Sequence, residues 1–107
     1  MKPEQADLVE RLREALATEQ PREVTMFGGR AFMVDDQMVV HAGNSGNLLV
    51  RVSPERDPDL VDTPGAARAE MGAGRSMGVG WISVRSDAIA DDEQLAGWVT
   101  AALDRIR

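Results

Sequence analysis

The sequence contains no cysteine and only one histidine, His41. The absence of cysteine excludes a disulfide framework, a thiolate metal site and a thiol nucleophile. A single histidine also excludes a metal site built from several imidazoles. The chain therefore cannot use a cysteine nucleophile, and it cannot bind a metal through cysteines or through several histidines.

Positive charge is scarce as well. Twelve lysines and arginines stand against eighteen acidic residues, which gives a net charge of −6. This balance argues against electrostatic attraction to nucleic acid or to an anionic membrane. The chain also lacks an apolar run long enough to span a membrane, and its first residues lack the hydrophobic stretch of a signal peptide. We therefore expect a cytoplasmic protein with no direct nucleic-acid binding and no membrane contact.

The chain does contain two amphipathic segments, one near each end. Pro3 to Thr18 and Asp91 to Arg107 repeat apolar residues at three- and four-residue steps, which predicts two helices. Asp91 is predicted to be the N-cap of the second helix, with Gln94 at the capping-box position. The apolar stripes consist of Leu8, Val9, Leu12, Ala15 and Leu16 in the first helix and Leu95, Trp98, Val99, Ala102, Leu103 and Ile106 in the second.

Three strands are predicted after the first helix, over residues 23–34, 38–42 and 47–52. Gly28 and Gly29 interrupt the first of them. They form either a turn between two strands or a kink within one long strand, and we favour the kink. In the last strand, alternation separates two sets that face opposite sides, with Leu48, Val50 and Val52 on one side and Leu49 and Arg51 on the other.

The second half of the chain has weaker patterns. A short helix is expected over residues 55–61, with Ser53 as its cap. Residues 66–71 fit either a strand or a helix. Residues 72–80 contain four glycines and are expected to be irregular, and residues 81–85 form a strand.

This order of elements predicts a single α+β domain over residues 1–107. It has two layers, with an antiparallel five-stranded sheet in α-β(3)-α-β(2)-α order. The terminal helices are expected to pack on one face of the sheet. The other face is then either solvated or used for binding, as is common in antiparallel sheets.

Several short motifs follow one another in an order that resembles a known family. They are Met26-Phe27-Gly28-Gly29, Phe32-Met33-Val34, Leu49 to Glu55, Pro64-Gly65-Ala66, Gly74-Arg75-Ser76-Met77, Trp81 and Trp98-Val99 with Ala102-Leu103. Together they resemble the N-terminal domain of TfoX/Sxy proteins over nearly the whole chain after the first helix. The resemblance implies the same α-β(3)-α-β(2)-α order, described as secretion-chaperone-like.

TfoX/Sxy proteins regulate natural competence in bacteria as coactivators that work with a cyclic-AMP receptor protein. That role belongs to two-domain members, in which a helical domain follows this one. The sequence up to Arg107 contains no counterpart of the helical domain, so the resemblance predicts a single-domain member. The family usually has proline where Ser76 stands.

No group of residues predicts catalysis, a cofactor or a metal site. The segment 72–78 contains Arg75 among its glycines and can present N–H groups to an anion. It leads into a strand rather than a helix, however, and has no lysine, so a loop between strands is favoured. His41 fits a partly buried strand residue better than a catalytic base. The acidic groups Asp35-Asp36 and Asp91 to Glu93 fit a turn and a helix start.

The methionines indicate a different function. Met26, Met33, Met38, Met71 and Met77 cluster around the predicted sheet, and methionine is frequent at adaptable binding surfaces. We therefore expect a non-catalytic interaction or regulatory module that binds an unknown protein, with a transcription regulator and a homodimer as the partners considered. The alternatives are a protein or enzyme that binds a small anionic ligand through the Arg/Gly-rich loop, and a DNA-associated transcription coactivator. The candidate surface comprises Met26, Phe27, Gly28, Gly29, Arg51, Gly74, Arg75, Met77 and Trp81.

Overall fold

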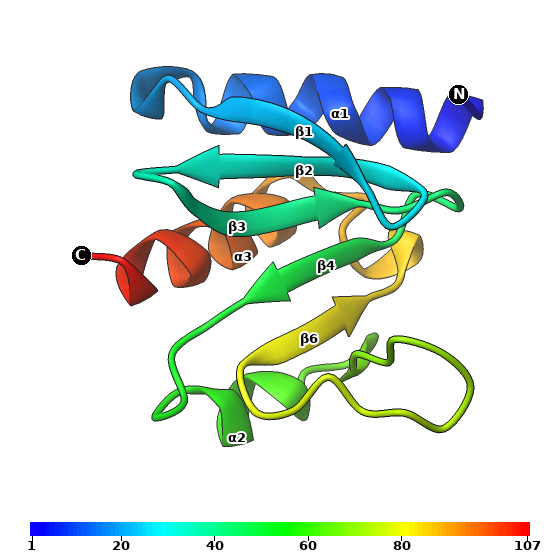
Figure 1. Cartoon of the computed structure of the whole chain (residues 1–107), viewed down its shortest axis with the longest axis vertical. Helices are drawn as coiled ribbons and strands as arrows, with labels where there is room; N and C mark the ends of the chain where they lie inside the picture. The colour runs from blue at the N-terminus through cyan, green and yellow to red at the C-terminus, as the bar shows by residue number, and fades with distance from the viewer.

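The computed structural model describes all 107 residues and contains one antiparallel sheet with three helices (Figure 1). The helices are α1 (Pro3–Ala15), α2 (Asp57–Val61) and α3 (Asp92–Arg105). The strands are β1 (Arg22–Met26), β2 (Gly29–Val34), β3 (Gln37–Ala42), β4 (Leu48–Arg51), β5 (Ala66–Arg68) and β6 (Trp81–Val84). Their order across the sheet is β1-β2-β3-β4-β6-β5. The α+β class and the antiparallel sheet are confirmed, but the sheet has six strands instead of five.

The sixth strand arises at the Gly28–Gly29 pair, where the structure has a hairpin turn in place of the favoured kink. Met26 pairs with Gly29 in the ladder between β1 and β2, so Phe27 and Gly28 form the turn. Both residues have positive φ, 53° for Phe27 and 72° for Gly28. Positive φ at both central residues defines a type I′ turn, which matches the twist of the two strands that it joins. The prediction of one long strand was wrong, and the element order is α-β(4)-α-β(2)-α.

The starts of the helices were predicted with mixed success. At α3, the carboxylate of Asp91 accepts a hydrogen bond from the backbone N–H of Gln94 at 3.4 Å. The side chain of Gln94 in turn accepts one from the N–H of Asp91 at 3.2 Å. This reciprocal pair confirms the predicted capping box. At α2, the side chain of Ser53 makes no cap; its backbone carbonyl accepts from the N–H of Asp57 instead.

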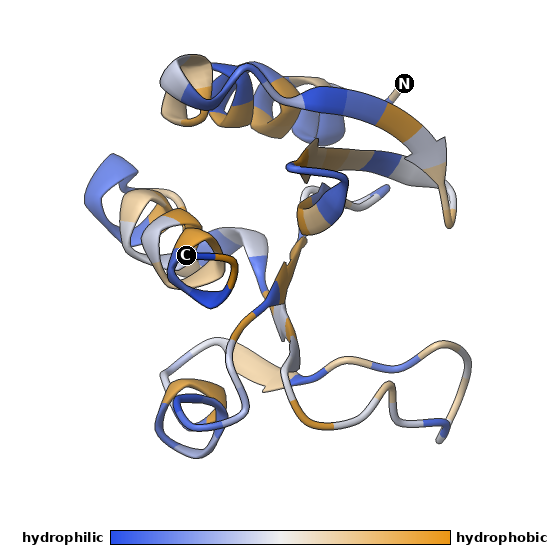
Figure 2. Cartoon of the chain, turned by 60° about the vertical axis from the view of Figure 1, so that its left-hand side comes forward, coloured by the Kyte–Doolittle hydropathy of each residue, from blue (hydrophilic) through white to orange (hydrophobic).

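The main hydrophobic core lies between the sheet and the two long helices. Figure 2 shows α1 and α3 on one side of the sheet, while the long loop before β6 extends to the other side. The core contains Leu8, Leu12 and Leu16 from the first helical region, Phe32, Val40, Val50 and Ile82 from the strands, and Leu95, Trp98 and Ala102 from α3. None of the three helices has the length and apolar character needed to cross a membrane. The two long helices, α1 and α3, instead each use one apolar stripe to cover the sheet.

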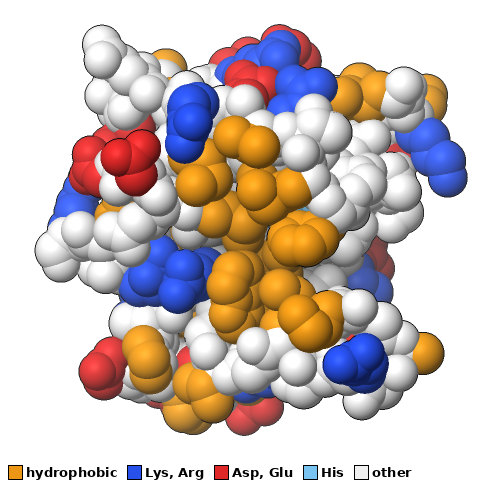
Figure 3. Space-filling model, viewed as in Figure 1, with side chains coloured by type: hydrophobic (Ala, Val, Ile, Leu, Met, Phe, Trp, Pro, Cys, Tyr) orange, Lys and Arg blue, Asp and Glu red, His pale blue; other side chains and the backbone are white.

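The opposite face of the sheet carries a second, smaller apolar cluster with no residue from any helix. It is built from Met26, Ala31, Met33, Met38, Leu49, Ala69, Met77 and Trp81. We refer to these eight residues as the helix-free face. Figure 3 shows hydrophobic side chains gathered in a continuous band across this side of the molecule. The fold thus leaves one apolar surface that no helix covers.

Candidate functional site

Strand alternation places the side chains of the helix-free face. In β4, Leu48 and Val50 enter the main core, whereas Leu49 faces the second cluster, as predicted. In β6, Ile82 enters the main core and Trp81 faces the second cluster in the same way. Successive side chains in a strand point to opposite faces, so this arrangement follows from the sequence once the sheet is formed.

Arg51 and Trp81 are cross-strand neighbours at one end of this face. The two residues are paired in the β4–β6 register, and the Arg51 guanidinium carbon lies 4.9 Å from the Trp81 ring centre. This distance is suitable for a cation–π interaction. The interaction fixes the position of a positive charge beside the apolar cluster.

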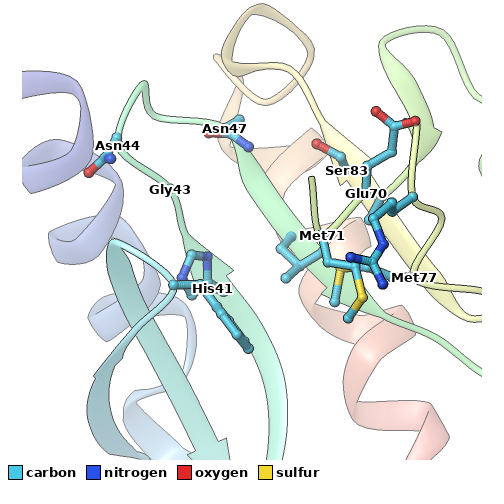
Figure 4. A pocket seen from close by; sticks show the side chains of 12 residues that line it. His41, Gly43, Asn44, Asn47, Glu70, Met71, Met77 and Ser83 are labelled. Carbon is cyan, nitrogen blue, oxygen red and sulfur yellow. The ribbon is translucent and has the colours of Figure 1, made fainter. Parts of the chain in front are cut away.

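A groove of about 640 Å³ opens at the other end of the face. His41 and Asn47 lie on one side of it, and Met71 and Met77 lie on the opposite side (Figure 4). Leu49 lines the groove and also belongs to the helix-free face, so the two are continuous. The lining comprises Phe27, His41, Gly43, Asn44, Asn47, Leu49, Ala69, Glu70, Met71, Arg75, Met77 and Ser83. Five of the twelve lining residues are hydrophobic and six are polar or charged, so the groove can offer both apolar contacts and hydrogen bonds to a ligand.

The β1–β2 hairpin turn forms the rim of the groove. Phe27 is 73% exposed at the tip of the turn, and its ring centre lies 6.2 Å from that of His41. His41 is buried, and its Nε2 lies 2.8 Å from the Met26 carbonyl oxygen, which requires Nε2 to be the donor. The histidine therefore has a structural hydrogen bond, in agreement with its interpretation as a strand residue.

Gly29 is needed for close packing against His41. Its φ is not in the left-handed region, which differs from the positive φ of Gly28. A Cβ atom at Gly29 would lie 2.6 Å from Cε1 of His41 and closer still to the carbonyl oxygen of Ala42. Such distances are well below van der Waals contact. The second glycine of the pair is therefore required by the neighbouring strand.

A buried ion pair holds the loop that forms the other side of the groove. Arg68 donates to both carboxylate oxygens of Asp57, at 2.7 and 2.6 Å, and to the carbonyl oxygen of Gly78 at 2.9 Å. The N–H of Gly80 donates to Asp57 at 2.7 Å. The Arg68 hydrogen bonds, together with that from Gly80, lower the pKa of Asp57 despite its burial. Sequence reasoning missed this pair, because an acid at a helix start is ordinarily solvated.

The structure brings together most of the candidate surface. Met26, Met77 and Trp81 belong to the helix-free face, Arg51 lies over Trp81, and Phe27 and Arg75 line the groove. Gly28 and Gly29 shape the hairpin at its rim. Gly74 has no neighbour within 4 Å of its Cβ position and contributes only to the exposed loop. No group of three or more histidine or acidic side chains is placed to hold a metal ion.

The loop between β5 and β6 follows the interpretation that the sequence favoured. It connects two neighbouring antiparallel strands and does not lead into a helix. Arg75 lies on this loop and lines the groove, but no helix N-terminus accompanies it there. The arrangement differs from a phosphate-binding loop, in which helical N–H groups add to the anion site.

The sequence was also compared with known proteins. The family model described as the TfoX N-terminal domain matches residues 14–106 of the 107-residue chain. The match includes every strand and both sides of the groove. No curated protein matches the chain.

Proposed function

The chain belongs to the TfoX N-terminal domain family, and we propose that it is a non-catalytic interaction module that binds a protein partner through its helix-free face. One observation carries this proposal. Met26, Met33, Met77 and Trp81 lie half-exposed on a sheet face that no helix covers. A contiguous exposed apolar patch usually marks an interaction site rather than ordinary surface. Methionine side chains are flexible and can pack against partners of irregular shape.

The protein would act as a regulator by binding its partner through the helix-free face. The resemblance to competence regulators supports a partner in transcription, such as an activator protein in the cytoplasm. Direct binding to DNA is disfavoured by the net charge of −6. Catalysis is not proposed, because the only histidine already uses Nε2 in a hydrogen bond to a backbone carbonyl.

A small anionic ligand in the groove is the second candidate. The volume of about 640 Å³ is suitable for a ligand of metabolite size. Arg75 offers a positive charge at the groove, and Asn44 and Asn47 offer amide groups. The groove is continuous with the apolar face, however, and a small ligand would leave most of that face exposed. The larger surface therefore favours a protein partner.

Affinity capture with matched variants tests the proposal. Met77→Glu introduces a charge on the helix-free face, whereas Thr100→Glu introduces the same charge on the exposed side of α3. Both proteins should remain folded by circular dichroism. We expect a partner identified with the wild type, and then titrated as purified protein, to bind Met77→Glu at least about tenfold more weakly. Equal binding by wild type and Met77→Glu would show that the partner uses another surface.

A further inference from the structure

We propose that the segment bound by the helix-free face is an acidic amphipathic peptide segment of the partner, with large apolar side chains flanked by carboxylates. This inference rests on the proposed function and specifies the chemistry of the partner. It is carried by the distribution of arginines that form no ion pair within the protein.

Most arginines of this chain form an ion pair within the protein, but Arg51 and Arg75, which border the helix-free face and its groove, do not. Eight of the eleven arginines have a carboxylate oxygen within 3.8 Å, as expected for a protein with an excess of acids. The three arginines without such a partner are Arg51, Arg75 and Arg105. With eighteen acidic residues available, three unpaired arginines indicate positions where a carboxylate from outside can bind.

Arg105 lies in α3, and its charge is affected by that of Arg51. Burial, and then the nearby positive charge of Arg51, lower the pKa of Arg105. Arg105 donates from Nη2 to the Gln37 side chain at 3.1 Å, while its buried Nε has no partner. Figure 3 shows positively charged side chains bordering the apolar band. A carboxylate beside Arg51 would form a charge-assisted hydrogen bond with its guanidinium group.

The third unpaired arginine lies at the groove. Arg75 is exposed on the loop that carries Met71 and Met77, and all three line the groove. Glu70 is the one carboxylate among the lining residues, and it forms no ion pair with Arg75. A segment that crosses the face therefore meets positive charge near both ends and apolar side chains between them.

The distance between the groove and Arg51 can be spanned by a short extended peptide. Leu49 lines the groove, and Arg51 lies two residues further along the same face of β4, a separation of about 7 Å. An apolar side chain in the groove and a carboxylate at Arg51 can thus come from residues i and i+2 of an extended peptide. Because the whole chain carries a charge of −6, the attraction is local and acts within about 10 Å at moderate salt.

Three synthetic probes of roughly twelve residues test this inference. The first combines glutamate with leucine and phenylalanine, the second replaces each glutamate by lysine, and the third is a single-stranded oligonucleotide of similar length. Binding is followed by fluorescence anisotropy at physiological salt, and the site by amide and indole shifts in ¹⁵N-labelled full chain. We expect only the glutamate peptide to bind, with shifts at Leu49, Met77 and the Trp81 indole.

Four variants separate charge from packing. We expect Arg51→Gln and Arg75→Gln each to weaken the glutamate peptide by about tenfold, because each loses a charge-assisted hydrogen bond. Arg51→Lys retains the charge and should lose less. Lys2→Gln removes the same charge from the residue before α1 and should bind as the wild type does. Arg75 lies on an exposed loop, so its replacement leaves the fold intact.

The remaining outcomes overturn the inference in different ways. Equal binding of the lysine and glutamate peptides at the helix-free face would exclude acidic recognition while supporting the proposed interaction surface. Tighter binding of the oligonucleotide would assign the arginines to nucleic acid. Binding of neither peptide, or glutamate-peptide shifts confined to α1 or α3, would remove the acidic segment as the occupant. The Met77→Glu capture experiment tests the face itself separately.

Discussion

Arg68 and Asp57 join the two ends of the loop that forms one side of the groove. Arg68 precedes this loop, residues 69–80, and donates to both oxygens of Asp57. Gly80, at the end of the loop, donates its backbone N–H to the same carboxylate at 2.7 Å. A single carboxylate therefore positions the segment that supplies Met71, Arg75 and Met77 to the groove.

Replacement of Arg68 by alanine should be among the most destabilising changes to a charged residue. It leaves the side chain of Asp57, which is only 3% exposed, without its main partner. Removing one member of a buried ion pair costs about 3 kcal/mol of unfolding free energy. Urea unfolding measures this loss. Arg85→Ala is the control, because Arg85 and its partner Asp87 are both 71% exposed and the change should be within about 0.5 kcal/mol.

The same ion pair should make the stability depend on pH in the acidic range. The pKa of Asp57 is lower in the folded protein than in the unfolded chain, chiefly because of the Arg68 hydrogen bonds. The stabilisation is therefore fully present above the unfolded value of about 4 and is lost as the pH falls through the folded value. Unfolding free energies of wild type and Asp57→Asn should differ most near neutral pH and converge below about pH 4. Parallel curves would contradict this role.

Local sequence patterns predicted much of the fold, because the forces behind them are local. The Asp91–Gln94 capping box requires only residues three apart in one helix start. The alternation of Leu48 and Leu49 between two faces requires only an extended strand. Both features were read correctly from spacing alone. The positions of the candidate side chains on one face follow from the same alternation.

The features that were missed depend on contacts between distant segments or on backbone choice. Phe27-Gly28 lacks the asparagine or aspartate that usually marks a type I′ turn, so a kink was favoured over a hairpin. Asp57 in α2 and Arg68 in β5 are eleven residues apart, and neither local sequence indicates that the two side chains will pair. The groove likewise depends on how the loop of residues 69–80 folds back. No periodic pattern specifies that path.

Gly29→Ala should destabilise the protein through close packing. The added Cβ would lie 2.6 Å from Cε1 of His41, and overpacking of this kind costs about 1–3 kcal/mol. The imidazole resonances of His41 should shift as the ring moves away from the Met26 carbonyl. Gly97→Ala is the matched control, because no atom lies within 4 Å of its Cβ position. Within α3 it should stabilise the protein by about 0.5–1 kcal/mol. A neutral Gly29→Ala would contradict the packing argument.

Phe27→Asn should separate stability from binding at the hairpin tip. Phe27 holds a positive φ of 53° although it carries a bulky side chain, and this conformation costs it about 1 kcal/mol. Asn-Gly is the preferred pair for a type I′ turn, so the variant should gain roughly 0.5–1 kcal/mol of unfolding free energy. A strained phenylalanine that is 73% exposed adds little to stability, and its presence at the rim of the groove therefore favours a role in binding.

The same variant should bind the proposed partner segment more weakly, because Phe27 lines the groove and its apolar side chain would be replaced by a polar one. Thermal unfolding and peptide anisotropy on one preparation measure both effects. Phe27→Leu is the control, since it retains an apolar side chain with the same backbone strain and should bind nearly as the wild type does. A Phe27→Asn protein that is more stable and binds the peptide as well as the wild type would show that the apolar side chain of Phe27 contributes neither to stability nor to binding. If Phe27→Asn is instead less stable, the packing of the Phe27 ring against His41, whose ring centres lie 6.2 Å apart, stabilises the fold by more than the strain of the turn destabilises it.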